Sequence, residues 1–286
     1  MANTKPSFDI TLLIEILKQH NIDTIFYLDR IRFYTDCRAN INDLDNLKTL
    51  NKKNKIILKS LPHHEHLTKH VDLFQVSKNL LAELVSGHYQ LGDYAINYIE
   101  IACDFLLKTK KQKTAVQHFL GRHLAHKSQR ATDSRSGYYF NEHKGTWYYA
   151  PKKNKERFAI YSDLASRTHK FKHCIHLEFR IDGLNQVKQH GVYTFNNLLT
   201  LDHKAFWGES LRLLKPNFTK LGEYARQDKK QTKAVADNRR GNNLWLGVVH
   251  LQDYLSKNTC DDAFFNVTTE KVLRQLLDEE FAHFET

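Results

Sequence analysis

The sequence predicts an α+β fold, in which an antiparallel sheet with associated helices is followed by a helical C-terminal region. Two observations predict it. Segments of strand character follow one another through the first two thirds of the chain, separated by polar, Gly and Pro signals. From Leu184 onward, helical spacing of apolar residues dominates. A chain of 286 residues with 41% hydrophobic content can bury a substantial core and is too apolar for a disordered protein.

The first half of the chain contains segments with strand periodicity and segments with helix periodicity. β-Branched and aromatic runs predict strands, and apolar residues at helical spacing predict helices, one of them closed by Gly87. Residues 37–56 are polar and predict a loop. We expect a helix over 7–20, a strand or bent hairpin over 21–36, strands over 55–61, 70–77 and 93–105, and helices over 78–87 and 109–127.

The second half begins with short strands and ends in helices. We expect strands over 138–141, 145–151, 156–163 and 174–183, then helices over 184–191, 196–214, 242–258 and 268–284. The polar, basic stretch 229–241 predicts a linker. The predicted organisation is a catalytic α+β domain over 1–228, this linker, and a helical region over 242–286.

The net charge of +11 is concentrated in the middle of the chain. Residues 105–172 hold sixteen Lys or Arg against four acids, whereas 261–286 hold seven acids and two bases. Tyrosines and a tryptophan are interleaved with the basic residues, a combination typical of surfaces that bind phosphates and stack on bases. The alternative is a solvated basic face above core aromatics.

The cysteines and the lack of long apolar stretches indicate the compartment. The four cysteines are far apart and form no CxxC pair, which argues against a zinc ribbon or a disulfide scaffold. No stretch approaches the roughly 18 apolar residues of a membrane span, and the first residues do not resemble a signal peptide. We therefore expect a cytoplasmic protein with no membrane partner.

Two predicted strands carry acids on one face. Strand periodicity places Glu100 and Asp104 on the same side of 93–105, and His176, Glu178 and Arg180 on the same side of 174–183. Carboxylates and a histidine from neighbouring strands would suit a hard cation, Mg²⁺ or Mn²⁺. An amphipathic strand with its polar side in water is the alternative.

Tyr161 lies where the pattern of FAIYSDLASR changes from strand to helix, just after a basic stretch. A phenol close to cations can attack a phosphodiester, because positive charge stabilises the phenolate. A half-buried tyrosine with a solvated hydroxyl is the alternative.

An ordered set of motifs over roughly residues 21–215 resembles rolling-circle replication initiation proteins of the filamentous-phage gene II type and related plasmid Rep factors. The motifs are NIDTIFYL, YIEIACDF, ERFAIYSDLASR and HLEFRIDGLNQVKQHGVYTFNNLL. The family's nicking tyrosine corresponds to Tyr161, although Asp163 replaces a lysine that the family often has two residues later. Glu100, Asp104 and Glu178 correspond to the family's acids.

The resemblance implies a metal-dependent nickase that joins Tyr161 to a 5′ phosphate, leaves a 3′-OH primer and later reseals the strand. Its metal ligands would be Glu100, Asp104 and Glu178, with His176. Expected partners are single-stranded or supercoiled origin DNA, a host helicase and single-strand-binding protein, and a second copy of the chain in a homodimer. The expected DNA-binding residues are Lys152, Lys153, Lys155, Arg157, Arg167 and Arg180.

Three other functions fit parts of the sequence. A relaxase or transposase would nick DNA by the same chemistry. A non-catalytic DNA-binding regulator of replication would keep the basic surface without cleavage. An RNA-binding protein is less favoured, because no ring-stacking motif of the usual kind is present.

Overall fold

The computed structural model describes residues 10–36, 56–60, 67, 69–89, 91–126, 138–141, 146–149, 155–162, 164–166, 173–227, 263–267 and 269–285. Within them, the predicted α+β class with a mostly antiparallel sheet is confirmed. The linker 229–241 and the helix expected over 242–258 lie outside the described residues. No helix in the described part of the chain is both long and apolar enough to cross a membrane.

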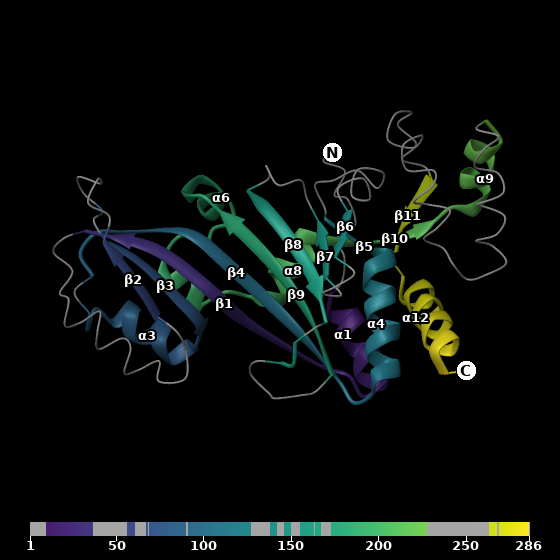
Figure 1. Cartoon of the computed structure of the whole chain (residues 1–286), viewed down its shortest axis with the longest axis horizontal. Helices are drawn as coiled ribbons and strands as arrows, with labels where there is room; N and C mark the ends of the chain where they lie inside the picture. The colour runs from purple at the N-terminus through teal and green to yellow at the C-terminus, as the bar shows by residue number, and fades with distance from the viewer. Residues whose placement is uncertain are drawn as a thin grey trace.

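In the described part of the chain, the main sheet has eight strands in the order β2-β3-β1-β4-β9-β8-β7-β6, and every neighbouring pair is antiparallel. The long strands β1, β4 and β9 cross the middle of the molecule (Figure 1). The strands are β1 Asp23–Thr35, β2 Ile56–Ser60, β3 Lys69–Val76, β4 Tyr94–Leu107, β6 Tyr138–Asn141, β7 Thr146–Tyr149, β8 Glu156–Tyr161 and β9 His173–Asp182.

One face of the sheet packs against helices and forms the core. Alternate residues of the central strands are fully buried there, including Ile99 and Ile101 of β4 and Leu177 and Phe179 of β9. The helices are α1 Ile10–Gln19, α3 Lys78–Ser86, α4 Lys110–His123, α6 Leu184–Gln189, α7 Phe195–Leu199, α8 His203–Ser210, α9 Phe218–Gln227 and α12 Glu270–Glu285. The C-terminal helix α12 packs against α4 (Figure 1).

The structure corrects the helix expected over 196–214. Asp202 caps a new helix, α8, by accepting a hydrogen bond from the amide of Ala205 at 3.1 Å. That helix ends at Ser210, and Leu211–Pro216 forms strand β10. β10 pairs with β5 (Leu124–His126) and β11 (Phe264–Asn266) in a second, three-stranded sheet. The leucines of β10 have a spacing that also fits a helix, so the sequence pattern alone did not show that they belong to a strand.

The segment over 21–36 forms one strand rather than a bent hairpin, but it is irregular. Its pairing with β4 shifts between Leu28 and Arg30, so Asp29 is an extra residue opposite β4. A bulge of this kind changes the direction of the side chains around it. Here both Asp29 and Arg30 contribute to the face of the sheet opposite the core, where the candidate site lies.

Candidate active site

The register of three strands brings the predicted site residues together. Between β4 and β9, Asp104 lies opposite His176, and Glu100 lies opposite Arg180. In the next pair, Tyr161 of β8 also lies opposite His176. The side chains that we expected on separate strands therefore share one face of the sheet, next to one another.

Three carboxylates form a buried cluster on this face. One oxygen from each of Asp29, Glu100 and Glu178 lies within 4.8 Å of the others. These residues are only 3%, 8% and 2% exposed. Oxygen ligands gathered this closely are the donors that a hard divalent cation prefers. Asp29 was not predicted from the sequence, although alternation from Tyr27 places it on this face; the bulge in β1 lets Asp29 and Arg30 both lie there.

The charge on the cluster supports the same interpretation. Burial, and then repulsion from Glu178, raises the pKa of Glu100 to about 7, against the opposing effect of a hydrogen bond from Tyr98. The Arg180 guanidinium donates a hydrogen bond to Glu178 and lies 3.9 Å from Glu100. It supplies one positive charge for three carboxyl groups. A divalent cation would relieve the repulsion that remains, so these residues fit Mg²⁺ or Mn²⁺.

Tyr161 is joined directly to this cluster. Its hydroxyl donates a hydrogen bond to Glu178 Oε2 at 2.8 Å, and its side chain is 9% exposed. Its ring stacks on that of His176, with centroids 4.8 Å apart and planes 21° apart. The phenol is thus held with its oxygen against a carboxylate that can accept its proton.

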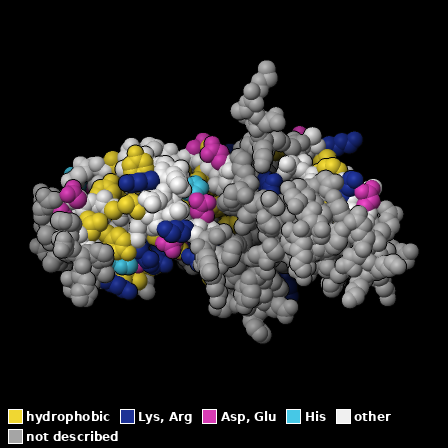
Figure 2. Space-filling model, turned by 90° about the horizontal axis from the view of Figure 1, so that it is seen from above, with side chains coloured by type: hydrophobic (Ala, Val, Ile, Leu, Met, Phe, Trp, Pro, Cys, Tyr) yellow, Lys and Arg dark blue, Asp and Glu magenta, His cyan; other side chains and the backbone are white. Residues whose placement is uncertain are grey.

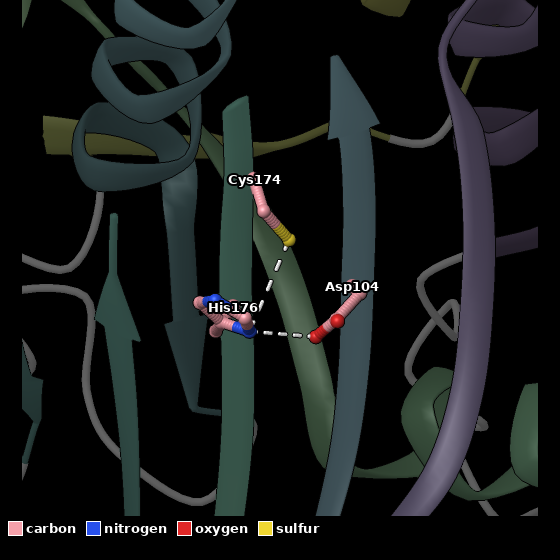
Figure 3. A group of neighbouring side chains, drawn as sticks. All are labelled: Asp104, Cys174 and His176. Carbon is pink, nitrogen blue, oxygen red and sulfur yellow. Dashed lines mark hydrogen bonds and ion pairs between the residues drawn. The ribbon is translucent and has the colours of Figure 1, made fainter. Parts of the chain in front are cut away.

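A second cluster contains Asp104, Cys174 and His176 (Figure 3). His176 Nδ1 lies 2.8 Å from Asp104 Oδ1 and 3.9 Å from Cys174 Sγ, and the other ring nitrogen lies 3.2 Å from the carbonyl oxygen of Leu164. Burial raises the pKa of the Cys174 thiol, so the neutral thiol is favoured. The four predicted ligands are thus divided: Glu100 and Glu178 lie in the first cluster, and Asp104 and His176 lie in the second.

The carboxylate of Asp104 has three hydrogen-bond partners, including His176. Its Oδ1 also accepts a hydrogen bond from the Tyr27 hydroxyl at 3.0 Å, and its Oδ2 accepts one from Ser166 at 2.8 Å. Both Asp104 and His176 are almost completely buried. This network fixes the imidazole on which Tyr161 stacks, and therefore fixes the tyrosine.

The predicted DNA-binding residues are only partly described. Lys155 is exposed, and half-buried Arg157 lies 3.9 Å from Asp182. Arg180 is occupied by the carboxylates of the first cluster. Lys152, Lys153 and Arg167 lie outside the described residues.

Comparison with known proteins gives little further information about the site. No family model and no curated protein matches the chain. Among solved structures, the chain is similar to a rolling circle replication initiator protein from Geobacillus stearothermophilus. The similarity has a TM-score of 0.40 and 9% identity, and it covers 68% of this chain and 88% of that one. At that level it identifies no residue of the site.

Proposed function

We propose that the protein is a metal-dependent DNA nickase that initiates rolling-circle replication by cutting one strand of origin DNA with Tyr161. The observation that carries the proposal is the 2.8 Å hydrogen bond from the Tyr161 hydroxyl to Glu178, within a cluster of three carboxylates. A nucleophile in contact with its base, beside a cation site, is the arrangement that phosphoryl transfer requires.

In this reaction, Glu178 accepts the phenolic proton as Tyr161 Oη attacks the scissile phosphorus. A Tyr–O–P bond forms and the bond to the 3′ oxygen breaks. That oxygen takes up a proton and becomes the 3′-OH primer, while the 5′ phosphate stays on Tyr161. Resealing is the reverse: a 3′-OH attacks the phosphotyrosine and the phenol is released.

Asp29, Glu100 and Glu178 would hold the cation. Bound Mg²⁺ or Mn²⁺ would supply Lewis-acid polarisation of the scissile phosphate. The protein itself holds the phenol in place: the ring is fixed by His176, and the hydroxyl by Glu178. Pre-positioning of this kind reduces the entropic part of the barrier.

The direct test is Tyr161→Phe, with Tyr193→Phe as the control because Tyr193 is 46% exposed and lies outside both clusters. Each protein is incubated with a labelled single-stranded origin library, with and without Mn²⁺. We expect the wild type and the control to form a covalent adduct that mass spectrometry maps to Tyr161, and the Tyr161 variant to form none. An adduct on another residue, or undiminished nicking by the variant, would overturn the assignment.

The same assay separates the other functions. DNA binding with no cleavage at any metal concentration would indicate a non-catalytic replication regulator. Cleavage and rejoining on transfer-origin or transposon-end DNA, but not on a replication origin, would indicate a relaxase or transposase. Recruitment of a host helicase and single-strand-binding protein, and dimerisation, stay predictions from the resemblance.

A further inference from the structure

Two arginines of β1 lie beside the carboxylate cluster on the same face of the sheet. Arg30 is opposite Glu100 of β4, and Arg32 is opposite Tyr98. On the other side of β1, Arg32 is opposite Asp72 of β3. We call the group formed by Arg30, Arg32, Asp72, Tyr98 and Phe74 the arginine face.

The two arginines share one carboxylate. Asp72 is 2% exposed, and its Oδ1 accepts hydrogen bonds from Arg30 Nε at 2.9 Å and Arg32 Nε at 3.0 Å. Burial by itself would raise the pKa of Asp72, but these two hydrogen bonds outweigh it and the pKa is lowered. Asp72 is therefore ionised at neutral pH, and the pair of arginines leaves one positive charge in excess.

Both guanidinium groups are bound to Asp72 through their Nε atoms and keep part of their surface open. The two side chains are 22% and 27% exposed. Because each Nε is held by Asp72, the Nη edges are pre-positioned, and less side-chain entropy is lost when an oxyanion binds.

Aromatic rings complete the surface. Arg30 lies over the ring of Phe74 at 4.8 Å, and both arginines lie over the ring of Tyr98, at 5.3 and 5.2 Å. The Tyr98 hydroxyl in turn donates a hydrogen bond to Glu100. Tyr98 thus connects the arginine face to the carboxylate cluster, since Glu100 follows it by two residues, about 7 Å, along β4. Figure 2 shows Lys and Arg side chains beside hydrophobic ones toward the end of the molecule that carries β2 and β3.

We infer that the arginine face binds the sugar-phosphate backbone of the single DNA strand on one side of the scissile phosphate. The planar guanidinium edges fit phosphate oxygens, and the two arginines carry one positive charge more than Asp72 neutralises. This inference rests on the proposed function for the identity of the strand, and it goes beyond it by assigning the strand's path to β1 and β3 rather than to the basic segment 105–172.

The test is Arg32→Gln, because Arg30 remains to pair with Asp72 and the fold keeps its buried ion pair. The control is Arg274→Gln, which removes the same charge from a surface pair on α12. Binding of fluorescent dT30 is measured from 50 to 300 mM salt in EDTA, so that no cleavage occurs. For Arg32→Gln we expect dT30 to bind about tenfold more weakly at low salt, with the slope of log K against log salt reduced by about 0.7.

Arg32→Lys should keep the slope close to that of the wild type, since the charge is retained. Equal affinity and slope for Arg32→Gln and the wild type would overturn the inference. So would equal losses in the Arg32 and Arg274 variants, because the effect would then be one of net charge alone.

A second measurement uses the wild-type protein and does not depend on how a variant folds. Phenylglyoxal modifies accessible arginines, and mass spectrometry reports which ones dT30 protects. We expect protection of Arg30 and Arg32 but not of Arg274, and failure to protect the first two would also overturn the inference.

The two proposals can fail separately. Nicking with no contribution from Arg32 would contradict DNA binding by the arginine face and leave the proposed nickase intact. Weaker dT30 binding by Arg32→Gln in a protein that never nicks would contradict only the nickase.

Discussion

Two acid-containing clusters occupy neighbouring positions on one face of the sheet, and they differ in what surrounds them. Asp29, Glu100 and Glu178 lie close together, and the pKa of Glu100 is raised to about 7. Asp104, by contrast, accepts hydrogen bonds from Tyr27 and Ser166 and lies 2.8 Å from His176 Nδ1. The first cluster has an excess of negative charge, and the second is a closed hydrogen-bond network.

The difference shows how one face of the sheet can both attract a cation and hold a side chain in place. Carboxylates that repel one another create an attractive site for a cation, whereas a carboxylate with a full set of donors is a rigid support. Tyr161 joins both, because its hydroxyl contacts Glu178 and its ring stacks on His176. In the proposed reaction the first cluster provides the chemistry and the second holds the nucleophile.

The largest effect should follow from changing the carboxylate that contacts Tyr161. Glu178→Gln removes both the proton acceptor and one cation ligand, so we expect DNA cleavage to fall by about 10³-fold. Mn²⁺ binding, measured by electron paramagnetic resonance, should weaken as well. Glu83→Gln, on the exposed side of α3, is the matched control and should cleave normally. Cleavage by Glu178→Gln within tenfold of the wild type would contradict the role.

Changing the closed network should affect stability instead. Asp104→Asn disturbs the buried hydrogen bonds that this carboxylate makes with His176, Tyr27 and Ser166, so we expect about 3 kcal/mol less free energy of unfolding in urea. Mn²⁺ affinity should stay within about threefold, since the ligands lie in the other cluster. Asp278→Asn, whose side chain is 68% exposed, should change stability by less than about 0.5 kcal/mol. Loss of Mn²⁺ binding by Asp104→Asn would place the cation in the second cluster.

The pH dependence of stability should report the repulsion among the carboxylates of the first cluster. The pKa of Glu100 is raised from 4.5 to about 7, so in metal-free buffer the native state binds more protons than the unfolded state between these values. Stability should therefore fall as pH rises from about 4.5 to about 7, by about 3 kcal/mol in total. Glu100→Gln should abolish most of this decrease in thermal unfolding measurements. Saturating Mn²⁺ should oppose it, because the cation binds the ionised carboxylate. An identical pH profile for Glu100→Gln and the wild type would show that another group is responsible.

The smallest effect should come from the thiol of the second cluster. Cys174 Sγ lies 3.9 Å from His176 Nδ1, a long contact that contributes little. Cys174→Ser should therefore cost about 1 kcal/mol of unfolding free energy and leave Mn²⁺-dependent cleavage within twofold. If the variant instead loses a bound zinc ion or all activity, the cluster is a metal centre rather than a support.

Much of the candidate site follows from periodicity in the sequence. Alternation along two strands places Glu100 with Asp104, and His176 with Glu178 and Arg180, and the structure keeps these groupings. Periodicity could not predict that Glu100 and Glu178 would be separated from Asp104 and His176. That division depends on the strands that flank this pair: β1, beside β4, supplies Asp29 and Tyr27, and β8, beside β9, supplies Tyr161.

The sequence by itself determined the α+β class, the concentration of positive charge and the polar faces of β4 and β9, because composition and side-chain alternation are local properties. Only the tertiary structure decided that Asp29 completes the carboxylate cluster, that Tyr161 contacts Glu178, and that Arg30 and Arg32 share Asp72. The partners in the last pairings lie 42 and 40 residues apart. Strand order, register and the bulge at Asp29 set these contacts, and they arise from hydrogen bonding and packing between distant segments, which no local pattern specifies.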